Sequence, residues 1–236
     1  MKQRIWELDV FRGICIIGVV FVHLMYDLAD LYHIIDWEYP AWFAFIKDWG
    51  GILFVLLSGA CATLGRRSVR RGLVVLGCGL VITAVTYGMT FFGFHKSVII
   101  YFGVLHCLGC CMILWWVFKR FPTWLLAVLG IFMAVAGLYL DQQHIYVTTH
   151  YLMPLGLPWE GFATSDYFPL LPHLGWFLLG AVLGRTVYRK KQTLLPMVNP
   201  KNFLVRIFSF LGRQSLWIYL LHQPIISGIC MLLMEK

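Results

Sequence analysis

The sequence has few charged residues. Asp, Glu, Lys and Arg make up 13% of its 236 residues, whereas a typical soluble domain has about 25%. Hydrophobic residues account for 60% of the chain, and its mean hydropathy is +0.78. This composition excludes an ordinary soluble globular domain and indicates a protein that crosses a membrane through apolar helices.

Three further absences narrow the class of membrane protein: outer cysteines, internal repeats or linkers, and a signal-peptide cleavage site. No cysteine falls in a predicted outer segment, because all seven lie inside apolar stretches, so a disulfide framework is not expected. No internal repeat or linker is visible, which favours one membrane domain over residues 1–236. The basic start resembles a signal peptide, but the first apolar run contains Arg12, has full span length and lacks a small-x-small cleavage site. We therefore predict a retained membrane helix there.

The apolar stretches predict an all-α polytopic membrane protein with about seven transmembrane helices. The predicted spans are Leu8–Leu28, Trp42–Leu64, Leu73–Phe92, Val98–Phe118, Trp124–Leu140, Leu170–Val187 and Ser215–Met234. Between the fifth and sixth spans, the long segment Asp141–Pro169 is expected to cap a pocket. Asn202–Leu211 is predicted to form a short interfacial helix before the last span.

The basic residues predict the orientation of these spans. With the N-terminus cytoplasmic, 16 of the 19 Lys and Arg lie on the inner side, which is the positive-inside pattern. The C-terminus is then extracytoplasmic. The net charge of +8 is explained by inner loops facing an anionic leaflet, so the lipid bilayer, and not nucleic acid, is the expected partner. The expected location is the cell membrane, as a multi-pass protein; in a bacterium this is the cytoplasmic membrane.

Two ionisable side chains interrupt the first apolar run. Charge inside a hydrophobic span is costly and usually marks a functional site. Arg12 and His23 are eleven residues apart, so on a helix they lie roughly 20° from the same face and about 16 Å apart along the axis. Asp27 follows His23 by one turn. Arg12 could instead snorkel to the inner headgroups, and His23 could bond a neighbouring helix.

An arginine cluster follows the second span on the same predicted side of the membrane as Arg12. It consists of Arg66, Arg67, Arg70 and Arg71 within Gly65–Gly72. Basic inner loops commonly do no more than set topology. Guanidinium groups also bind phosphates in a bidentate manner, so four of them could clamp a polyphosphate.

Four further histidines are candidate substrate-binding residues: His33, His106, His173 and His222. Solvation in an outer loop is the favoured interpretation of His33, which is also a reserve base, and interhelical hydrogen bonds are an equal alternative for His173 and His222. His33 follows the first span, and His222 precedes Pro224, which breaks the helical hydrogen-bond ladder. Two histidines facing each other across a bundle could also hold haem b. The pattern Cys107-x-x-Cys110 lies inside an apolar helix without a second ligand pair nearby, so small packing residues are favoured over a metal site.

Several motifs together resemble the transmembrane acyltransferase superfamily. The closer resemblance is to the family of the heparan-α-glucosaminide N-acetyltransferase catalytic domain. It is carried by the Arg12-x10-His23 spacing, by the arginines after the second span, and by the ordered segments Leu8–Gly13, Phe54–Gly59, Phe102–His106, Phe168–Gly180 and Leu211–Gln223. These run nearly from end to end of the chain.

The resemblance implies transfer of an acetyl or other short acyl group from cytoplasmic acyl-CoA to an extracytoplasmic acceptor, with an amino sugar or glycan as the expected acceptor and no metal. It makes Arg12, Arg67 and Arg70 contacts of CoA, and His23 the catalytic histidine. The chain has fewer spans than the larger family members. Their catalytic histidine lies nearer the loop after the first helix, which makes His33 a rival.

The chemistry of these residues fits independently. A neutral imidazole at His23 can take a proton from an attacking amine or hydroxyl, or become acylated itself. Asp27 could orient its ring. A small-molecule transporter and a haem b electron-transfer protein are the competing interpretations, although no repeat typical of transporters is visible. A homodimer is a candidate state.

Overall fold

The computed structural model describes residues 5–93 and 96–234. Lys2, Arg4 and Lys236, which entered the charge count, lie outside these ranges. The described residues form no β-strand; one isolated parallel bridge pairs Phe102 with Tyr167. The α-helices are α1 Trp6–Tyr26, α2 Ala41–Leu64, α3 Ser68–Met89, α4 Val104–Phe118, α5 Thr123–Gln142, α6 Leu170–Thr186, α7 Phe203–Arg213 and α8 Ser215–Met234.

Five helical stretches are long and apolar enough to cross a membrane. They are Trp6–Leu31, Ala41–Leu64, Ser68–Phe92, Thr123–Gln142 and Ser215–Met234. The helices α4 and α6 are shorter, with 15 and 17 residues. At 1.5 Å per residue they reach about 22 and 25 Å, less than the roughly 30 Å hydrocarbon core. The chain is therefore an all-helical membrane protein, and the count of seven spans and the orientation stay predictions.

The chain divides into two compact units. The first comprises Met1–Phe54 and Lys190–Lys236, and the second comprises Val55–Arg189. Because α2 contributes residues to both units, the expectation of a single domain stays a prediction.

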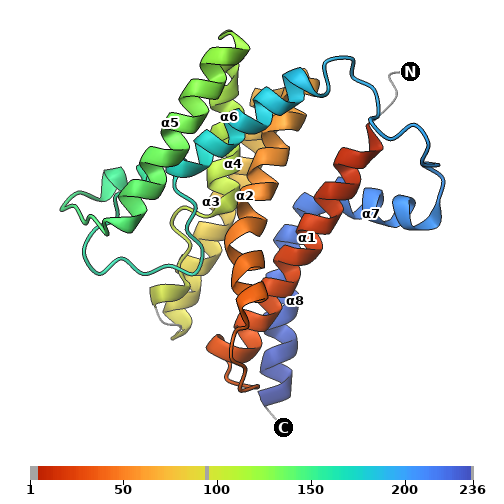
Figure 1. The fold of residues 1–236 in the computed structure, drawn as a ribbon. Coiled ribbons are helices and arrows are strands. Elements are labelled where there is room, and N and C mark those ends of the chain that lie inside the picture. The colour runs from red at the N-terminus through yellow and green to blue at the C-terminus, as the bar shows by residue number, and fades with distance from the viewer. Residues whose placement is uncertain (1–4, 94–95, 235–236) are drawn as a thin grey trace. The chain divides into compact units, whose positions relative to one another are not determined.

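In the first unit, α1 packs against α7 and α8 (Figure 1). The contact with α7 is backbone to backbone: a Cβ on Gly13 would lie 2.1 Å from the carbonyl oxygen of Phe208, and one on Gly212 would lie 1.8 Å from that of Asp9. No larger residue fits at either position without moving a helix. The helix predicted over Asn202–Leu211 is found as α7, Phe203–Arg213, and it crosses the start of α1; its position at the membrane interface stays a prediction.

In the second unit, glycines bring pairs of helices into close contact. A Cβ on Gly180 of α6 would lie 1.8 Å from the carbonyl oxygen of Leu56 of α2, and one on Gly175 would lie 2.4 Å from the backbone nitrogen of Ala134 of α5. Between α3 and α4, Gly109 approaches the backbone of Leu76. Small residues at helix contacts are typical of membrane bundles, since packing replaces the hydrophobic effect as the driving force there.

The order of these contacts gives the helix directions within each unit. Contacts of α5 with α6 pair Gly137 with Pro172 and Gly130 with Leu179, so these helices are antiparallel. The helices α3 and α4 are also antiparallel, whereas α1 and α8 run side by side in the same direction (Figure 1). Successive spans of a membrane protein run in opposite directions, and the first and seventh predicted spans, which contain α1 and α8, should run in the same direction. The observed directions fit the predicted path of the chain without fixing which side is cytoplasmic.

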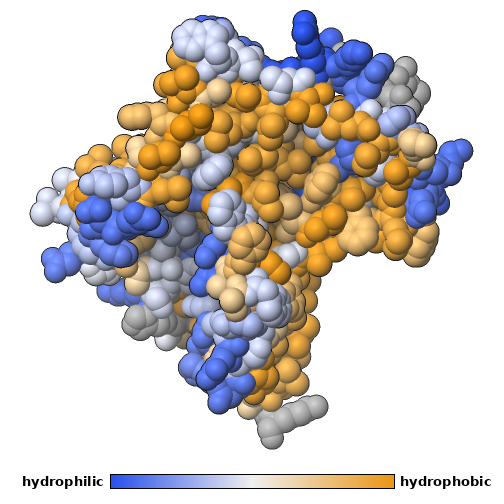
Figure 2. All heavy atoms as spheres, in the orientation of Figure 1, coloured by the Kyte–Doolittle hydropathy of each residue, from blue (hydrophilic) through white to orange (hydrophobic). Residues whose placement is uncertain are grey.

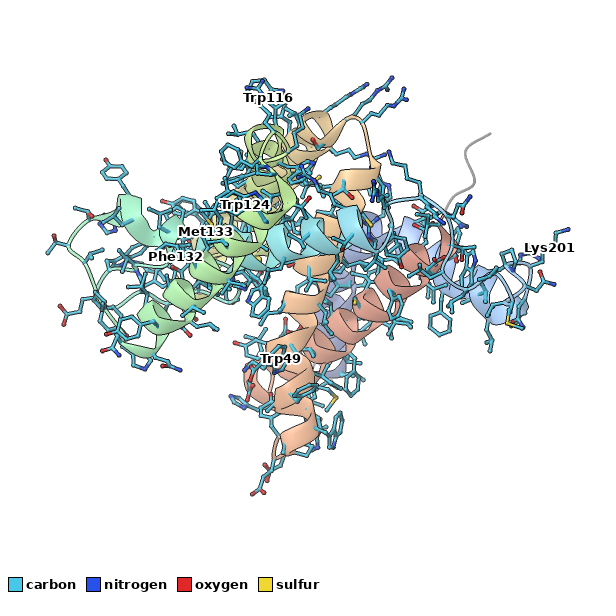
Figure 3. The ribbon with its side chains drawn as sticks, turned by 45° about the horizontal axis from the view of Figure 1, so that its top comes forward. Trp49, Trp116, Trp124, Phe132, Met133 and Lys201 are labelled. Atoms are coloured by element: carbon cyan, nitrogen blue, oxygen red, sulfur yellow. The ribbon has the colours of Figure 1, made fainter. Side chains whose placement is uncertain are left out.

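Many hydrophobic side chains remain exposed on the helix surfaces. Trp124, Phe132 and Met133 lie along α5 (Figure 3), and Trp124 and Phe132 are each 68% exposed. In the view of Figure 2, hydrophobic side chains cover most of the helix surfaces, while hydrophilic ones gather near helix ends and connecting segments. Apolar exposure on this scale indicates lipid contact.

Candidate active site

The C-terminal half of α1 meets α8 through two histidines. The ring centroids of His23 and His222 are 4.9 Å apart, with an interplanar angle of 64°. His222 is only 7% exposed. His23 therefore contacts a neighbouring helix, α8, while its role in a functional site stays a prediction.

A hydrogen bond within α8 fixes the ring of His222. Its Nδ1 atom lies 2.7 Å from the carbonyl oxygen of Tyr219. A carbonyl oxygen can only accept, so Nδ1 carries the hydrogen and donates it. In the neutral ring the basic lone pair is therefore on Nε2. The ring of Tyr219 also contacts that of His222, at 5.3 Å between centroids.

Asp27 is fully buried, with 0% exposure, in a π-helical segment, Asp27–Leu31, that continues α1. Its two carboxylate oxygens each accept a hydrogen bond of 2.9 Å from Nε2 of Gln223, and Oδ2 lies 3.3 Å from the hydroxyl of Ser227. The π-helical turn is a rare feature that often occurs at functional sites. The carboxylate predicted to orient His23 is thus bound to α8, on the turn that follows His222.

The rival base, His33, lies in the loop after the π-helical segment. It is exposed, has a positive φ of 51°, and donates from Nδ1 to the carbonyl oxygen of Ala29 at 3.0 Å. Farther along this loop, the hydroxyl of Tyr39 donates to Asp30. Burial and this hydrogen bond raise the pKa of Tyr39 to about 12. The segment after α1 is therefore held by local polar contacts.

His106 belongs to the second unit, near the start of α4. Its Nδ1 accepts the backbone N–H of Gly103 at 3.2 Å, and its Nε2 lies 3.1 Å from the hydroxyl of Thr83. That hydroxyl donates to the carbonyl oxygen of Ile100 at 2.6 Å, so it must accept from Nε2–H. Both ring nitrogens are thus engaged in joining α3, α4 and the segment between them. A substrate role for His106 stays a prediction.

His173 also belongs to the second unit, in the first turns of α6. Its Nδ1 donates to the carbonyl oxygen of Pro169 at 2.7 Å, and its ring lies 4.7 Å from that of Phe168. This leaves the lone pair of the neutral ring on Nε2, as in His222. Its predicted contact with substrate stays a prediction.

The cysteines of the C-x-x-C pattern do not pair with each other. Cys107 is buried and lies 4.0 Å, sulfur to sulfur, from Cys111, one helical turn along α4. Over the residues that the structure describes, no group of three or more His, Cys, Asp or Glu is arranged to hold a metal ion.

Arg12 lies on α1 beside the crossing with α7, since it precedes Gly13, one of the two glycines at that crossing. Nearby, the carboxylate of Glu7 is buried and accepts the backbone N–H of Leu194 at 2.8 Å and the hydroxyl of Thr193 at 2.9 Å. These contacts attach the segment before α7 to the first turn of α1. Arg12 therefore lies on a helix whose first turn is held in place by these contacts.

The four clustered arginines surround the N-terminus of α3 in the second unit. Arg67 is the N-cap residue, Arg66 precedes it, and Arg70 and Arg71 lie in the first turn. All four are exposed, and this first turn has no acidic residue. Helix N-termini attract anions through their free N–H groups and dipole. The cluster has the chemistry of a phosphate site, and its convergence with Arg12 stays a prediction.

Two residues of the His23–His222 region were not singled out as site residues. The contacts of Gln223 and Ser227 with Asp27 could not be predicted, because these residues lie 196 and 200 positions after it in the chain. The only sequence signal was the polar side chain of Gln223 next to His222 in an apolar helix.

Comparison with known proteins identifies the family. No curated protein matches the chain, and no solved structure does. A family model described as heparan-alpha-glucosaminide N-acetyltransferase, catalytic, matches residues 4–224. This range includes Arg12, the arginine cluster and all five histidines discussed above. The chain therefore belongs to the heparan-α-glucosaminide N-acetyltransferase catalytic-domain family, a family of membrane acetyltransferases.

Proposed function

We propose that this protein transfers an acetyl, or another short acyl, group from cytoplasmic acyl-CoA to the oxygen or nitrogen of an extracytoplasmic acceptor. An amino sugar or other glycan is the proposed acceptor. The observation that carries the proposal is the contact of His23 with His222 in the C-terminal half of α1, in a chain whose family is that of membrane acetyltransferases.

The shape of the donor fits the positions of the polar residues on α1. CoA has phosphates at one end and a thioester at the other, joined by a long flexible arm. If Arg12 and the arginines at the start of α3 bind the phosphates, the arm leads the thioester along α1 toward His23, about 16 Å away by helix rise. Charge-assisted contacts of Arg with phosphate are strong enough to hold the donor there.

The proposed chemistry at His23 is proton removal from the acceptor. As the acceptor attacks the thioester carbonyl, the neutral imidazole takes its proton. The alternative is a two-step route in which a histidine is first acylated. His33, His106, His173 and His222 remain the proposed contacts of the acceptor, and a second copy of the chain is a proposed partner.

The ring contact also favours this proposal over haem ligation by the same two residues. Axial imidazoles lie on opposite faces of a porphyrin, so the macrocycle would have to separate His23 from His222. Their edge-to-face contact at 4.9 Å instead suits side chains that share one proton-transfer site.

The proposal is tested with the purified protein in detergent, acetyl-CoA and glucosamine. We expect formation of N-acetylglucosamine together with one equivalent of free CoA thiol, and no Soret band in the absorption spectrum. A protein that carries a Soret band and leaves acetyl-CoA intact would contradict the proposal and favour the haem interpretation. Intact acetyl-CoA with labelled solute crossing proteoliposomes would favour a transporter.

A further inference from the structure

A catalytic histidine needs a group that fixes its tautomer. Asp27 was expected to serve His23 in this way, but both of its oxygens accept from Gln223 and one also meets Ser227. The side chain whose ring contacts that of His23 is His222.

His222 has the right atom for this task. Because its Nδ1 donates to the carbonyl oxygen of Tyr219, its Nε2 is the acceptor in the neutral ring. The hydrogen bond to the carbonyl also keeps the ring from turning over. His222 is buried, so few alternative positions are open to it.

The separation of the two rings suits an N–H···N contact. A hydrogen bond of about 3 Å between nitrogens at the edges of two imidazoles places the ring centroids roughly 5 Å apart. The observed centroid distance is 4.9 Å.

We infer that His222 is the positioning residue of His23: it accepts the N–H of one His23 nitrogen and thereby leaves the lone pair on the other nitrogen, which faces the acceptor. This inference rests on the proposed function. In this proposal the series runs from His23 through His222 to the carbonyl of Tyr219; the structure shows its second bond, from Nδ1 of His222 to that carbonyl. It also disperses the positive charge that His23 gains, as a carboxylate does in other catalytic histidine pairs.

In the one-step route, His23 carries a proton from the acceptor to the departing sulfur. The acceptor O–H or N–H bond breaks and its proton goes to His23, while the acceptor atom bonds to the acyl carbon. The C–S bond of the thioester then breaks, and the proton passes from His23 to the departing sulfur, which yields free CoA. His222 keeps its Nδ1–H throughout and forms no covalent bond.

The inference predicts a specific kinetic pattern for substitutions at position 222. His222→Ala should lower kcat for acetyl transfer about tenfold to 10²-fold, less than loss of the base itself, with KM for acetyl-CoA within twofold of wild type. His222→Gln, whose side-chain oxygen can still accept the N–H of His23, should retain more activity than His222→Ala. Added imidazole should partly restore His222→Ala.

The matched control is Ile226→Ala, because Ile226 is also 7% exposed and lies one turn later on α8. It removes a buried side chain from the same helix without removing a proton acceptor, so its kcat should stay near wild type and should not respond to imidazole. Thermal unfolding and CoA affinity of each variant show that it is folded.

The outcomes separate this inference from the proposed function. Wild-type protein that does not consume acetyl-CoA would overturn the proposed function. Active wild type, with folded His222→Ala retaining kcat within threefold, would overturn the positioning role alone. Equal losses in His222→Ala and Ile226→Ala, with no effect of imidazole, would also overturn it, because they would indicate packing.

Discussion

Replacing His23 with alanine is expected to reduce acyl transfer by roughly 10²–10⁴-fold, the usual contribution of a positioned acid–base group. The affinity for CoA should stay close to that of wild type, because the proposed phosphate contact at Arg12 is about 16 Å away along α1. Steady-state kinetics and calorimetric titration with CoA measure the two effects separately. A loss of kcat without loss of CoA binding is therefore the expected signature.

The comparison needs His33→Ala and Asp27→Asn in the same assay. His33 is exposed and is hydrogen-bonded to Ala29 in the π-helical segment, so its substitution should cost little activity. Asp27→Asn should act through the contact of the π-helical segment with α8, and should lower activity less than His23→Ala. If His33→Ala abolished turnover while His23→Ala stayed near wild type, the base would be His33.

Removing the proposed phosphate contacts is expected to weaken CoA binding. Arg12→Ala and Arg70→Ala should each lose about 1.5–3 kcal/mol of binding free energy, the range for a hydrogen bond to a charged group. Arg189→Ala is the matched control, since Arg189 is an exposed basic residue with no proposed contact. Calorimetric titration in detergent measures all three.

The same titrations test which phosphate is bound. Dephospho-CoA should bind less tightly than CoA if an arginine contacts the 3′-phosphate, and the difference should shrink in the variant that lacks that arginine. Unchanged CoA affinity in folded Arg12→Ala and Arg70→Ala proteins would contradict the phosphate clamp.

Helical structure was predictable from the sequence, but the extent of some helices was not. The apolar run Val98–Phe118 predicted one long span, whereas α4 begins at Val104. The preceding residues bind a distant segment: the carbonyl of Ile99 accepts from Thr164, and Phe102 pairs with Tyr167. Hydrophobicity alone cannot reveal such pairing, because Ile and Phe serve equally in a helix and in a buried extended segment.

The candidate residues of the site come from the sequence, and their roles stay predictions; their contacts could not be read from it. The helical spacing of Arg12 and His23 and the cost of charge in an apolar run pointed to α1 without structural information. The partners of Asp27 and His23 lie on α8, nearly 200 positions later. One helix's periodicity gives the face on which a residue lies, but not which residue of another helix meets it. The role of Asp27 as the group that orients His23 stays a prediction.

The central claim is transfer of an acyl group from a donor on one side of the membrane to an acceptor on the other. The most direct measurement uses sealed proteoliposomes of determined protein orientation, with radiolabelled acetyl-CoA supplied only to the face that carries the arginine cluster and glucosamine enclosed on the opposite side. We predict labelled N-acetylglucosamine in the compartment that never contained acetyl-CoA, and none with His23→Ala protein. Labelled product found only when donor and acceptor share one compartment would contradict the account.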